Sequence, residues 1–296
     1  MRGYVGLLAV LLVFTEAFCG VSSIDGYITA GLKGGNVLSS AGTDEVVQAD
    51  FEKYLVRPDA NYVISTDANS SIDNICRQMN SDPRTFIKRA IAKYNKDVND
   101  YTGVVHKQER IRDKLGKSQL IEFKLRQEPF SVFMKWRENP TDVDKLLYVT
   151  GKNKGKMRVH PRALFGLIRA VNIKPQSKKA LKNNLYPCTD FGLIKLLEKL
   201  LASYEESLKT GGVKTIELGV TLVDDRPCAA FGIVVGPGRS FGIRQILVEV
   251  DAEYLLPVGL VTFDEDGELV GRYVFEKLQF NVELSDADFT RKAAGL

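Results

Sequence analysis

Histidine, a common acid–base catalyst and metal ligand, is sparse in this sequence. The chain contains two histidines, His106 and His160, and neither belongs to a His-Glu-x-x-His pattern or to another spacing typical of a metal site. Both fall in stretches predicted to be β-strands, where a surface position explains a histidine without any ligand. We therefore expect no metal ion, no cofactor and no catalytic histidine.

Two glycine-rich turns resemble nucleotide-binding loops only superficially. The basic turn Gly151–Lys156 lacks the glycine spacing and the following Ser or Thr of a phosphate-binding loop, and no helix is predicted to begin after it. The Gly-Pro-Gly sequence at 236–238, with Gly242 beyond it, misses the dinucleotide-binding spacing and joins two predicted strands. Turn formation accounts for both segments.

Carboxylates are plentiful but they are grouped in predicted turns. Asp224-Asp225 and the acidic sequence 264–266 could in principle collect a calcium ion, although Asp is a normal residue of hairpin turns. A glycosidase-like pair of carboxylates need not be close in sequence, so a hydrolase of unrecognised type remains an alternative. The sequence favours a protein that is not an enzyme.

The first 22 residues have the layout of an export signal. A basic second residue precedes the apolar run Tyr4–Phe14, which is too short for a membrane span of roughly 20 residues. Cys19 stands where a bacterial lipoprotein carries its acylated cysteine, but Glu16 and Phe18 do not suit that signal. We expect a cleaved signal peptide over residues 1–22 and a location in the periplasm or cell envelope, with a lipid anchor at Cys19 as the less favoured alternative.

Three cysteines follow the predicted signal, which leaves at least one thiol unpaired. Cys188 and Cys228 have similar flanks, YPCTDF and RPCAAF, so a bridge between them is conceivable in an oxidising compartment. Two small buried hydrophobic residues are an equally good interpretation. The sequence leaves this choice open.

Charge is divided unevenly along the chain. Residues 84–183 contain 25 Lys and Arg against 9 Asp and Glu, whereas residues 184–296 contain 11 against 18. A basic surface could meet anionic lipid headgroups or an acidic partner. The two segments could equally neutralise each other across one sheet. Nucleic acid is not an expected partner, because no nucleic-acid-binding motif is present.

The stretch Pro129–Pro161 predicts consecutive short strands joined by turns. Strict alternation places Phe133 on the opposite face from Phe130, Val132, Met134 and Trp136, which is the pattern of a half-buried sheet. One of these two faces must meet an apolar interior. The pattern does not reveal whether that interior is a filled core or a cavity.

Two principal helices and about ten strands are predicted, grouped rather than alternating. One helix begins at Pro83 after the capping residue Asp82, and the other is capped by Thr189 or Asp190 and runs to about Lys209. This grouping indicates an α+β protein with a large antiparallel sheet. The predicted strands are 101–112, 118–127, 130–137, 146–150, 156–160, 213–223, 228–235, 241–250, 257–263 and 269–282.

The sequence before Pro83 predicts little regular structure. Gly, Ser, Asn and Asp are scattered through residues 23–82, which we interpret as a linker or loosely ordered arm with one short helix near 44–55. Residues 83–296 are then a single domain. Within it, residues 162–184 are predicted to be a lysine-rich surface excursion.

Separated sequence blocks resemble a bacterial family known as domain of unknown function 1571. The resemblance runs from about Tyr94 to Phe289, although the family more often has an aliphatic residue at the position of Cys188. The blocks are Asp100-Tyr101-Thr102-Gly103, Glu109-Arg110-Ile111, Pro129-Phe130-Ser131-Val132, Tyr148–Met157, Tyr186–Leu193 and Asp286–Phe289.

The family's layout is similar to that of periplasmic lipoprotein carriers of the LolA type. That resemblance implies an open antiparallel half-barrel covered by two principal helices, and it implies no catalytic residues. Such a half-barrel could bind a lipid, a lipoprotein acyl chain or another hydrophobic small molecule. The alternative is an envelope module that docks on a partner protein or membrane surface through its basic segment, with a filled core.

If a cavity exists, we expect large apolar side chains of the predicted strands to line it. Core packing is the competing explanation for each of them. The candidate lining residues are Phe133 and Trp136, Tyr148, Phe231 and Ile233, and Tyr273 and Phe275.

Overall fold

Twelve β-strands form one antiparallel sheet in the described part of the chain. The computed structural model describes residues 50–59, 62–162, 170–210, 212–235 and 243–296. The strands are β1 (Asp100–Ile111), β2 (Lys114–Leu115), β3 (Gln119–Arg126), β4 (Ser131–Glu138), β5 (Val143–Val149), β6 (Met157–Pro161), β7 (Val171–Ile173), β8 (Val213–Val223), β9 (Arg226–Val235), β10 (Gln245–Asp251), β11 (Pro257–Phe263) and β12 (Leu269–Phe280).

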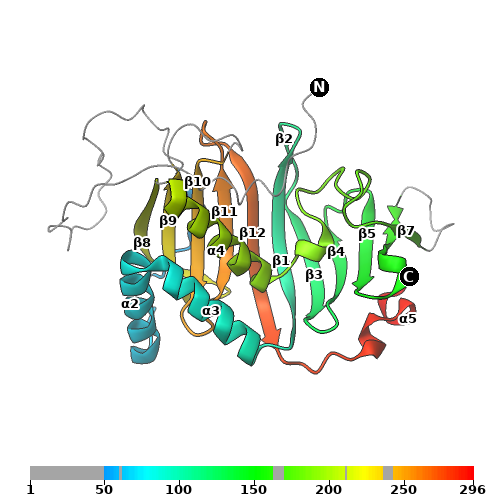
Figure 1. Ribbon diagram of the computed structural model, residues 1–296, viewed down its shortest axis with the longest axis horizontal. Coiled ribbons are helices and arrows are strands. Elements are labelled where there is room, and N and C mark those ends of the chain that lie inside the picture. Colours follow the sequence, from blue (N-terminus) through cyan, green and yellow to red (C-terminus); the bar gives the residue numbers. More distant parts are fainter. Residues whose placement is uncertain (1–49, 60–61, 163–169, 211, 236–242) are drawn as a thin grey trace.

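The strand order is β7-β6-β5-β4-β3-β1-β12-β11-β10-β9-β8, and β2 pairs with β1. The sheet is open because its first and last strands, β7 and β8, do not pair with each other. Most neighbours are joined by hairpins, but β1 and β12 lie side by side although they come from opposite ends of the domain (Figure 1).

The helices are η1 (Phe51–Tyr54), α2 (Thr66–Ser81), α3 (Pro83–Asp97), η2 (Asn153–Gly155), η4 (Cys188–Asp190), α4 (Leu193–Thr210), η5 (Asp286–Phe289) and α5 (Arg291–Ala294).

Helices α3 and α4 cross one face of the sheet, which we call the inner face, and α2 flanks them next to β8 and β9 (Figure 1). Apolar residues of alternating strand positions meet the helices there, as in β3, where Ile121, Phe123 and Leu125 are buried and their neighbours are not. The largest buried cluster of the molecule lies between this face and the three helices. Burial of these two complementary surfaces is what holds the helices on the sheet.

The opposite face, the outer face, is covered in two places. Residues 51–57 form a strap over β9, β10 and β11, where Phe51 packs against Leu247 and Phe263. Strands β10 and β11 are therefore buried along their whole length. At the other end of the sheet, η5 and α5 cover β4 and β5, with Phe289 and Leu296 against Leu147. Both coverings use segments that are remote in sequence from the strands they protect.

The α+β class, the open antiparallel sheet and the two principal helices are confirmed. The helix predicted after Asp82 is α3, whose first turn is capped by the Asp82 side chain accepting a hydrogen bond from the Thr85 backbone N–H. The helix predicted to end near Lys209 is α4. Each predicted strand is present, with ends shifted by a few residues.

The prediction of a loosely ordered arm over residues 23–82 is wrong for residues 66–81. These form α2, capped by Ser65, which buries Ile72, Ile75, Cys76 and Met79. In the sequence these four apolar residues are interspersed with polar ones, so the apolar stripe that they form is hard to recognise. The stripe is buried because α3, β8 and β9 pack against it. The predicted surface excursion 162–184 likewise contains β7.

Several predictions fall outside the described residues. The export signal at 1–22, the lipid anchor at Cys19 and most of the helix near 44–55 belong to this group, and residues 51–54 form η1. No helix in the described part of the chain is long and apolar enough to cross a membrane.

Glu249 on the outer face of β10 makes stability depend on pH. Its side chain is buried, and burial raises its pKa from 4.5 to about 7. Between these two values the folded protein binds more protons than the unfolded chain, so stability falls as pH rises through this range. The free energy of unfolding of Glu249→Gln, relative to that of the wild type, should therefore rise by roughly 3 kcal/mol as the pH increases from 4 to 8.

Urea unfolding of both proteins at several pH values measures this difference. Glu265→Gln is the matched control, because Glu265 is exposed in the turn between β11 and β12. The control should follow the wild type at every pH. A constant difference between Glu249→Gln and the wild type across the range would contradict the prediction.

Candidate ligand-binding cavity

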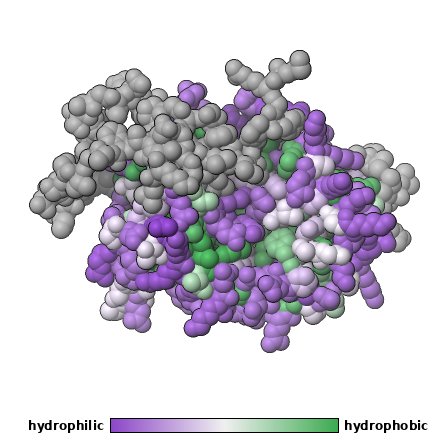
Figure 2. All heavy atoms as spheres, viewed as in Figure 1, coloured by the Kyte–Doolittle hydropathy of each residue, from purple (hydrophilic) through white to green (hydrophobic). Residues whose placement is uncertain are grey.

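A cavity opens on the inner face of the sheet, next to the start of α4. Strands β1, β3, β4, β5, β6 and β12 form its floor, and residues 175–192 with the first turns of α4 form its roof. Its volume, taken as the space that the centre of a water molecule can occupy, is about 120 Å³. On the same measure, about 10–15 Å³ is enough for one water molecule. Figure 2 shows hydrophobic residues near the centre of this face within a mostly hydrophilic surround.

The floor is apolar because neighbouring strands present matching inward positions. Val105 of β1 is paired with Ile121 of β3, and Met134 of β4 is paired with Leu146 of β5, which is paired in turn with Val159 of β6. All five line the cavity. Each belongs to the period-two pattern that the strands show in sequence, so strand alternation and antiparallel register together build this wall.

The roof is held close to the floor by contacts of the segment just before α4. Phe191 packs edge-on against Phe123, with ring centroids 5.1 Å apart, and the Cys188 Sγ lies 3.7 Å from Met157 Sδ. The backbone N–H of Leu193 donates a hydrogen bond of 2.9 Å to the Tyr101 hydroxyl. These contacts fix the start of α4 on the sheet and leave the cavity beside it.

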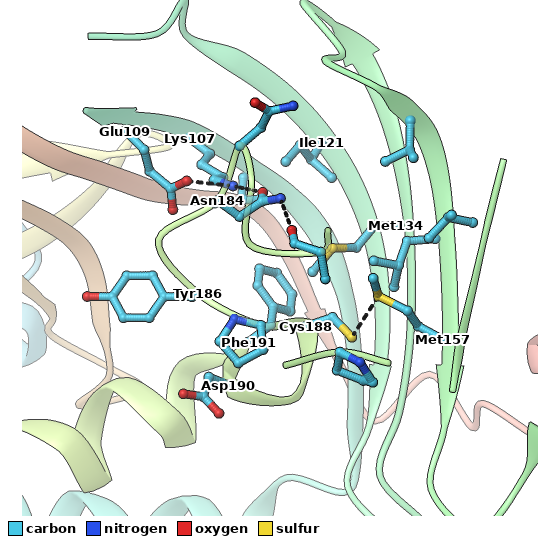
Figure 3. A pocket seen from close by; sticks show the side chains of 18 of the residues that line it. Lys107, Glu109, Ile121, Met134, Met157, Asn184, Tyr186, Cys188, Asp190 and Phe191 are labelled. Carbon is cyan, nitrogen blue, oxygen red and sulfur yellow. Dashed lines mark hydrogen bonds and ion pairs between the residues drawn. The ribbon is translucent and has the colours of Figure 1, made fainter. Parts of the chain in front are cut away.

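One end of the cavity is polar, and its charges are already partnered. The Glu109 carboxylate is buried and accepts hydrogen bonds from the Tyr273 hydroxyl at 2.6 Å and the Leu185 backbone N–H at 3.1 Å. Lys107 lies between Glu109, at 2.9 Å, and the Asn184 side-chain oxygen, at 2.6 Å (Figure 3). Burial, together with the Glu109 charge, raises the pKa of Tyr273 well above its usual value. Tyr273 therefore stays a neutral donor.

A second charged group lies where the roof meets α4. Lys199 Nζ is 3.2 Å from an Asp190 carboxylate oxygen and 4.1 Å from the centre of the Tyr186 ring. Burial lowers the pKa of Lys199, and the nearby Asp190 opposes that effect. The ammonium group thus has both an ion-pair and a cation–π partner, which holds Tyr186 at the cavity wall.

Among the described residues, none that lines the cavity is arranged as a nucleophile with a base. Burial raises the pKa of the Cys188 thiol to about 12, so it is not a thiolate at neutral pH. His106 contacts Glu276 at 3.2 Å and His160 contacts Asp144 at 2.6 Å, and neither histidine lines the cavity. The described residues contain no group of three or more His, Cys, Asp or Glu able to hold a metal ion. The arrangement suits retention of an apolar group.

Three of the predicted lining residues do line this cavity, namely Trp136, Tyr273 and Phe275. Ile233 lines a second, smaller apolar pocket, of about 30 Å³, enclosed by α2, α3, α4 and the strands β8 to β11. Met134 and Trp136 therefore mark the face of β4 that looks into the cavity.

The other three predicted residues line neither pocket. Phe231 is fully buried in the core between the sheet and the helices, and Tyr148 packs against Phe130. Phe133 points to the outer face, where it joins the cluster around Phe289. Alternation places it opposite Trp136 correctly, but the C-terminal segment that covers it cannot be inferred from the strand.

The sequence interpretation misses the roof and the polar end. It assigns residues 175–184 to a surface excursion and gives no role to Lys107, Glu109 or Tyr186. A signal is nevertheless present, because two blocks of the family resemblance, Glu109-Arg110-Ile111 and Tyr186–Leu193, contribute to the cavity wall. Cys188 and Cys228 are both buried and free, so the conceivable bridge is absent.

Fold and site together define an α+β protein whose open antiparallel sheet carries a roofed apolar cavity on its inner face. The chain belongs to the DUF1571 family, described as proteins of unknown function, whose model matches residues 98–294. This confirms the family resemblance of the sequence blocks. No curated protein matches the chain significantly.

Solved structures similar to this chain include MucB, at 13% identity and a TM-score of 0.43 over 72% of this chain. This chain spans 64% of the length of MucB, which has also been solved with MucA from Pseudomonas aeruginosa. Others are the Mycobacterium tuberculosis lipoprotein LppX (13% identity, TM-score 0.42, 69% of this chain and 99% of LppX) and a LolA superfamily protein from Nitrosomonas europaea (11%, 0.28, 69% and 97%).

Gly192 is the residue that allows the roof to approach the sheet. Its φ is +118°, and a Cβ there would lie 2.7 Å from Leu125 Cδ1 and 2.9 Å from the Tyr101 hydroxyl oxygen. Gly192→Ala should lower the free energy of unfolding by roughly 2–4 kcal/mol, through backbone strain and a steric clash together.

Gly151→Ala is the matched control for the strain, since Gly151 has a φ of +78° but a Cβ at this position would meet no atom within 4 Å. Its free energy of unfolding should fall by only about 1 kcal/mol. Urea unfolding compares the two variants. Equal losses would show that close approach to Leu125 and Tyr101 is not what requires glycine at 192.

Proposed function

We propose that this protein is a non-enzymatic binder or carrier of a hydrophobic ligand, such as a lipid or a lipoprotein acyl chain. The single observation that carries the proposal is the cavity between the inner face of the sheet and residues 175–192. Its floor is apolar, and its buried carboxylate, Glu109, already has a hydroxyl, an ammonium and a backbone N–H as partners. An apolar chain can therefore enter without leaving that charge unpaired.

The favourable free energy of binding comes from removing apolar surface from water. Each methylene group that moves from water into the cavity contributes about 0.8 kcal/mol. The cavity holds only part of a long acyl chain. Several methylene groups would therefore lie inside it, and the rest of the chain would lie at its mouth. Such a ligand is recognised by shape and apolarity more than by hydrogen bonds.

The proposed setting is extracytoplasmic. The support is the signal-like sequence of residues 1–22, which lies outside the described part of the chain. A ligand of low water solubility also fits a carrier that works between membranes. We place the protein in the periplasm or cell envelope on these grounds, and we propose no catalytic activity.

A second candidate function is docking on an envelope protein or membrane surface. The observation in its favour is the excess of basic residues between 84 and 183. The two candidates differ in what accompanies the protein isolated from its native envelope. Acyl lipids in stoichiometric amount support the carrier, whereas a lipid-free protein that retains one partner in a salt-sensitive manner supports docking.

Trp136 provides a direct test of occupancy, because it is the one tryptophan of the chain and it lines the cavity. A soluble lipid with brominated acyl chains should quench its fluorescence in proportion to binding. Ala180 also lines the cavity and is half-buried, so Ala180→Phe should fill the space and weaken binding at least tenfold, about 1.4 kcal/mol or more.

Ala92→Phe is the matched control, since Ala92 is exposed on α3. It should bind like the wild type. Quenching that is absent in the wild type, or that is the same in Ala180→Phe and Ala92→Phe, would contradict the carrier function. Thermal unfolding of each variant verifies that the comparison is between folded proteins.

A further inference from the structure

A second concavity adjoins the cavity and has the opposite character. It is a broad basin of about 650 Å³, formed by the end of β1, β2 and its turns, residues 139–141 and Lys182-Asn183. It shares four lining residues with the apolar cavity, namely Lys107, Glu109, Thr141 and Asn183. The two spaces are therefore adjacent at the polar end described above.

The basin carries an excess of positive charge. Its charged lining residues are one carboxylate, Glu109, and six basic side chains: Lys107, Arg112, Lys114, Lys117, Arg162 and Lys182. Lys107 is paired with Glu109, and Lys182 lies 2.9 Å from the exposed Asp142 carboxylate. The Arg162 guanidinium donates to the carbonyls of Pro140 and Thr141, and among the described residues it forms no ion pair with a carboxylate.

Lys114 and Lys117 add two exposed ammonium groups. Both belong to the turn region around β2, and no carboxylate lies within ion-pair distance of either in the described part of the chain. Lys114, Lys117 and Arg162 around one concavity create a positive potential that attracts an anion. Phosphate and carboxylate groups are the anions that such Lys and Arg side chains bind best.

We propose that the ligand is an anionic amphiphile whose acyl chain lies in the apolar cavity and whose phosphate or carboxylate headgroup lies in the adjoining basic basin. The proposal rests on the carrier function and adds the chemistry of the headgroup. Adjacency carries it: the two spaces share four lining residues, so one molecule with an acyl chain and a charged head can extend from one space into the other past these side chains. Glu109 is neutralised by Lys107, so it does not repel such a headgroup.

Binding of short-chain lipids tests the proposal without a membrane surface. Calorimetry compares dioctanoyl phosphatidic acid, dioctanoyl phosphatidylcholine and dioctanoylglycerol below their aggregation concentrations, so that the chains are identical and the headgroups differ. The wild type should bind the phosphatidic acid roughly tenfold tighter than the other two. Raising the salt concentration should remove this preference and leave the binding of dioctanoylglycerol unchanged.

The double variant Lys114→Gln, Lys117→Gln should lose most of the preference for phosphatidic acid while keeping its affinity for dioctanoylglycerol. Lys96→Gln with Lys214→Gln is the matched control, because both lysines are exposed and neither lines the cavity or the basin. The control should keep the wild-type preference. Both double variants change the net charge equally, so only the position of the charge differs.

The outcomes separate this inference from the function on which it rests. Equal affinity for the three lipids, or equal effects of the two double variants, would overturn the headgroup site and leave the carrier function standing. Failure of every lipid to bind would overturn both. Inorganic phosphate that binds as tightly as phosphatidic acid would show an anion site independent of the cavity and would also overturn the proposal.

Discussion

The pairing of β1 with β12 is the interaction on which the rest of the structure depends. The strands β3 to β7 and β8 to β11 are two series of neighbours joined mostly by hairpins. The register that pairs Tyr101 with Phe280 and Glu109 with Gly271 joins these halves into one sheet. Without it, each half would expose an unpaired edge, which is a site for aggregation.

The same pairing creates the site. It brings Tyr273 of β12 beside Glu109 of β1, so the buried carboxylate receives the hydroxyl group that it needs. It also places Phe275 against Phe123 and Phe191, which positions the roof before α4. The apolar floor comes from β3 to β6, and the polar end comes from the junction of the two halves. The cavity and the basin meet at this junction.

Local patterns in the sequence predicted the elements well where burial is one-sided. The alternation from Phe130 to Trp136 indicated β4 and its two faces, and the turn chemistry around Gly151 and Gly267 indicated the hairpins. Prediction failed for α2, where four apolar residues are dispersed in a polar helix. It also failed for the three-residue β7, which pairs with its neighbour β6, and for the strap at Phe51, which packs on strands remote in sequence.

The sequence by itself determined most of the strands, two of the long helices and the antiparallel sheet, because these follow from residue type and spacing along the chain. Tertiary structure alone decided which apolar side chains line a cavity and which fill a core. Trp136 and Phe133 are equally apolar neighbours on one strand, yet one faces the cavity and the other faces the C-terminal cluster. The physical reason is that a side chain's surroundings depend on segments that pack on it from far away in sequence, and periodicity carries no information about them.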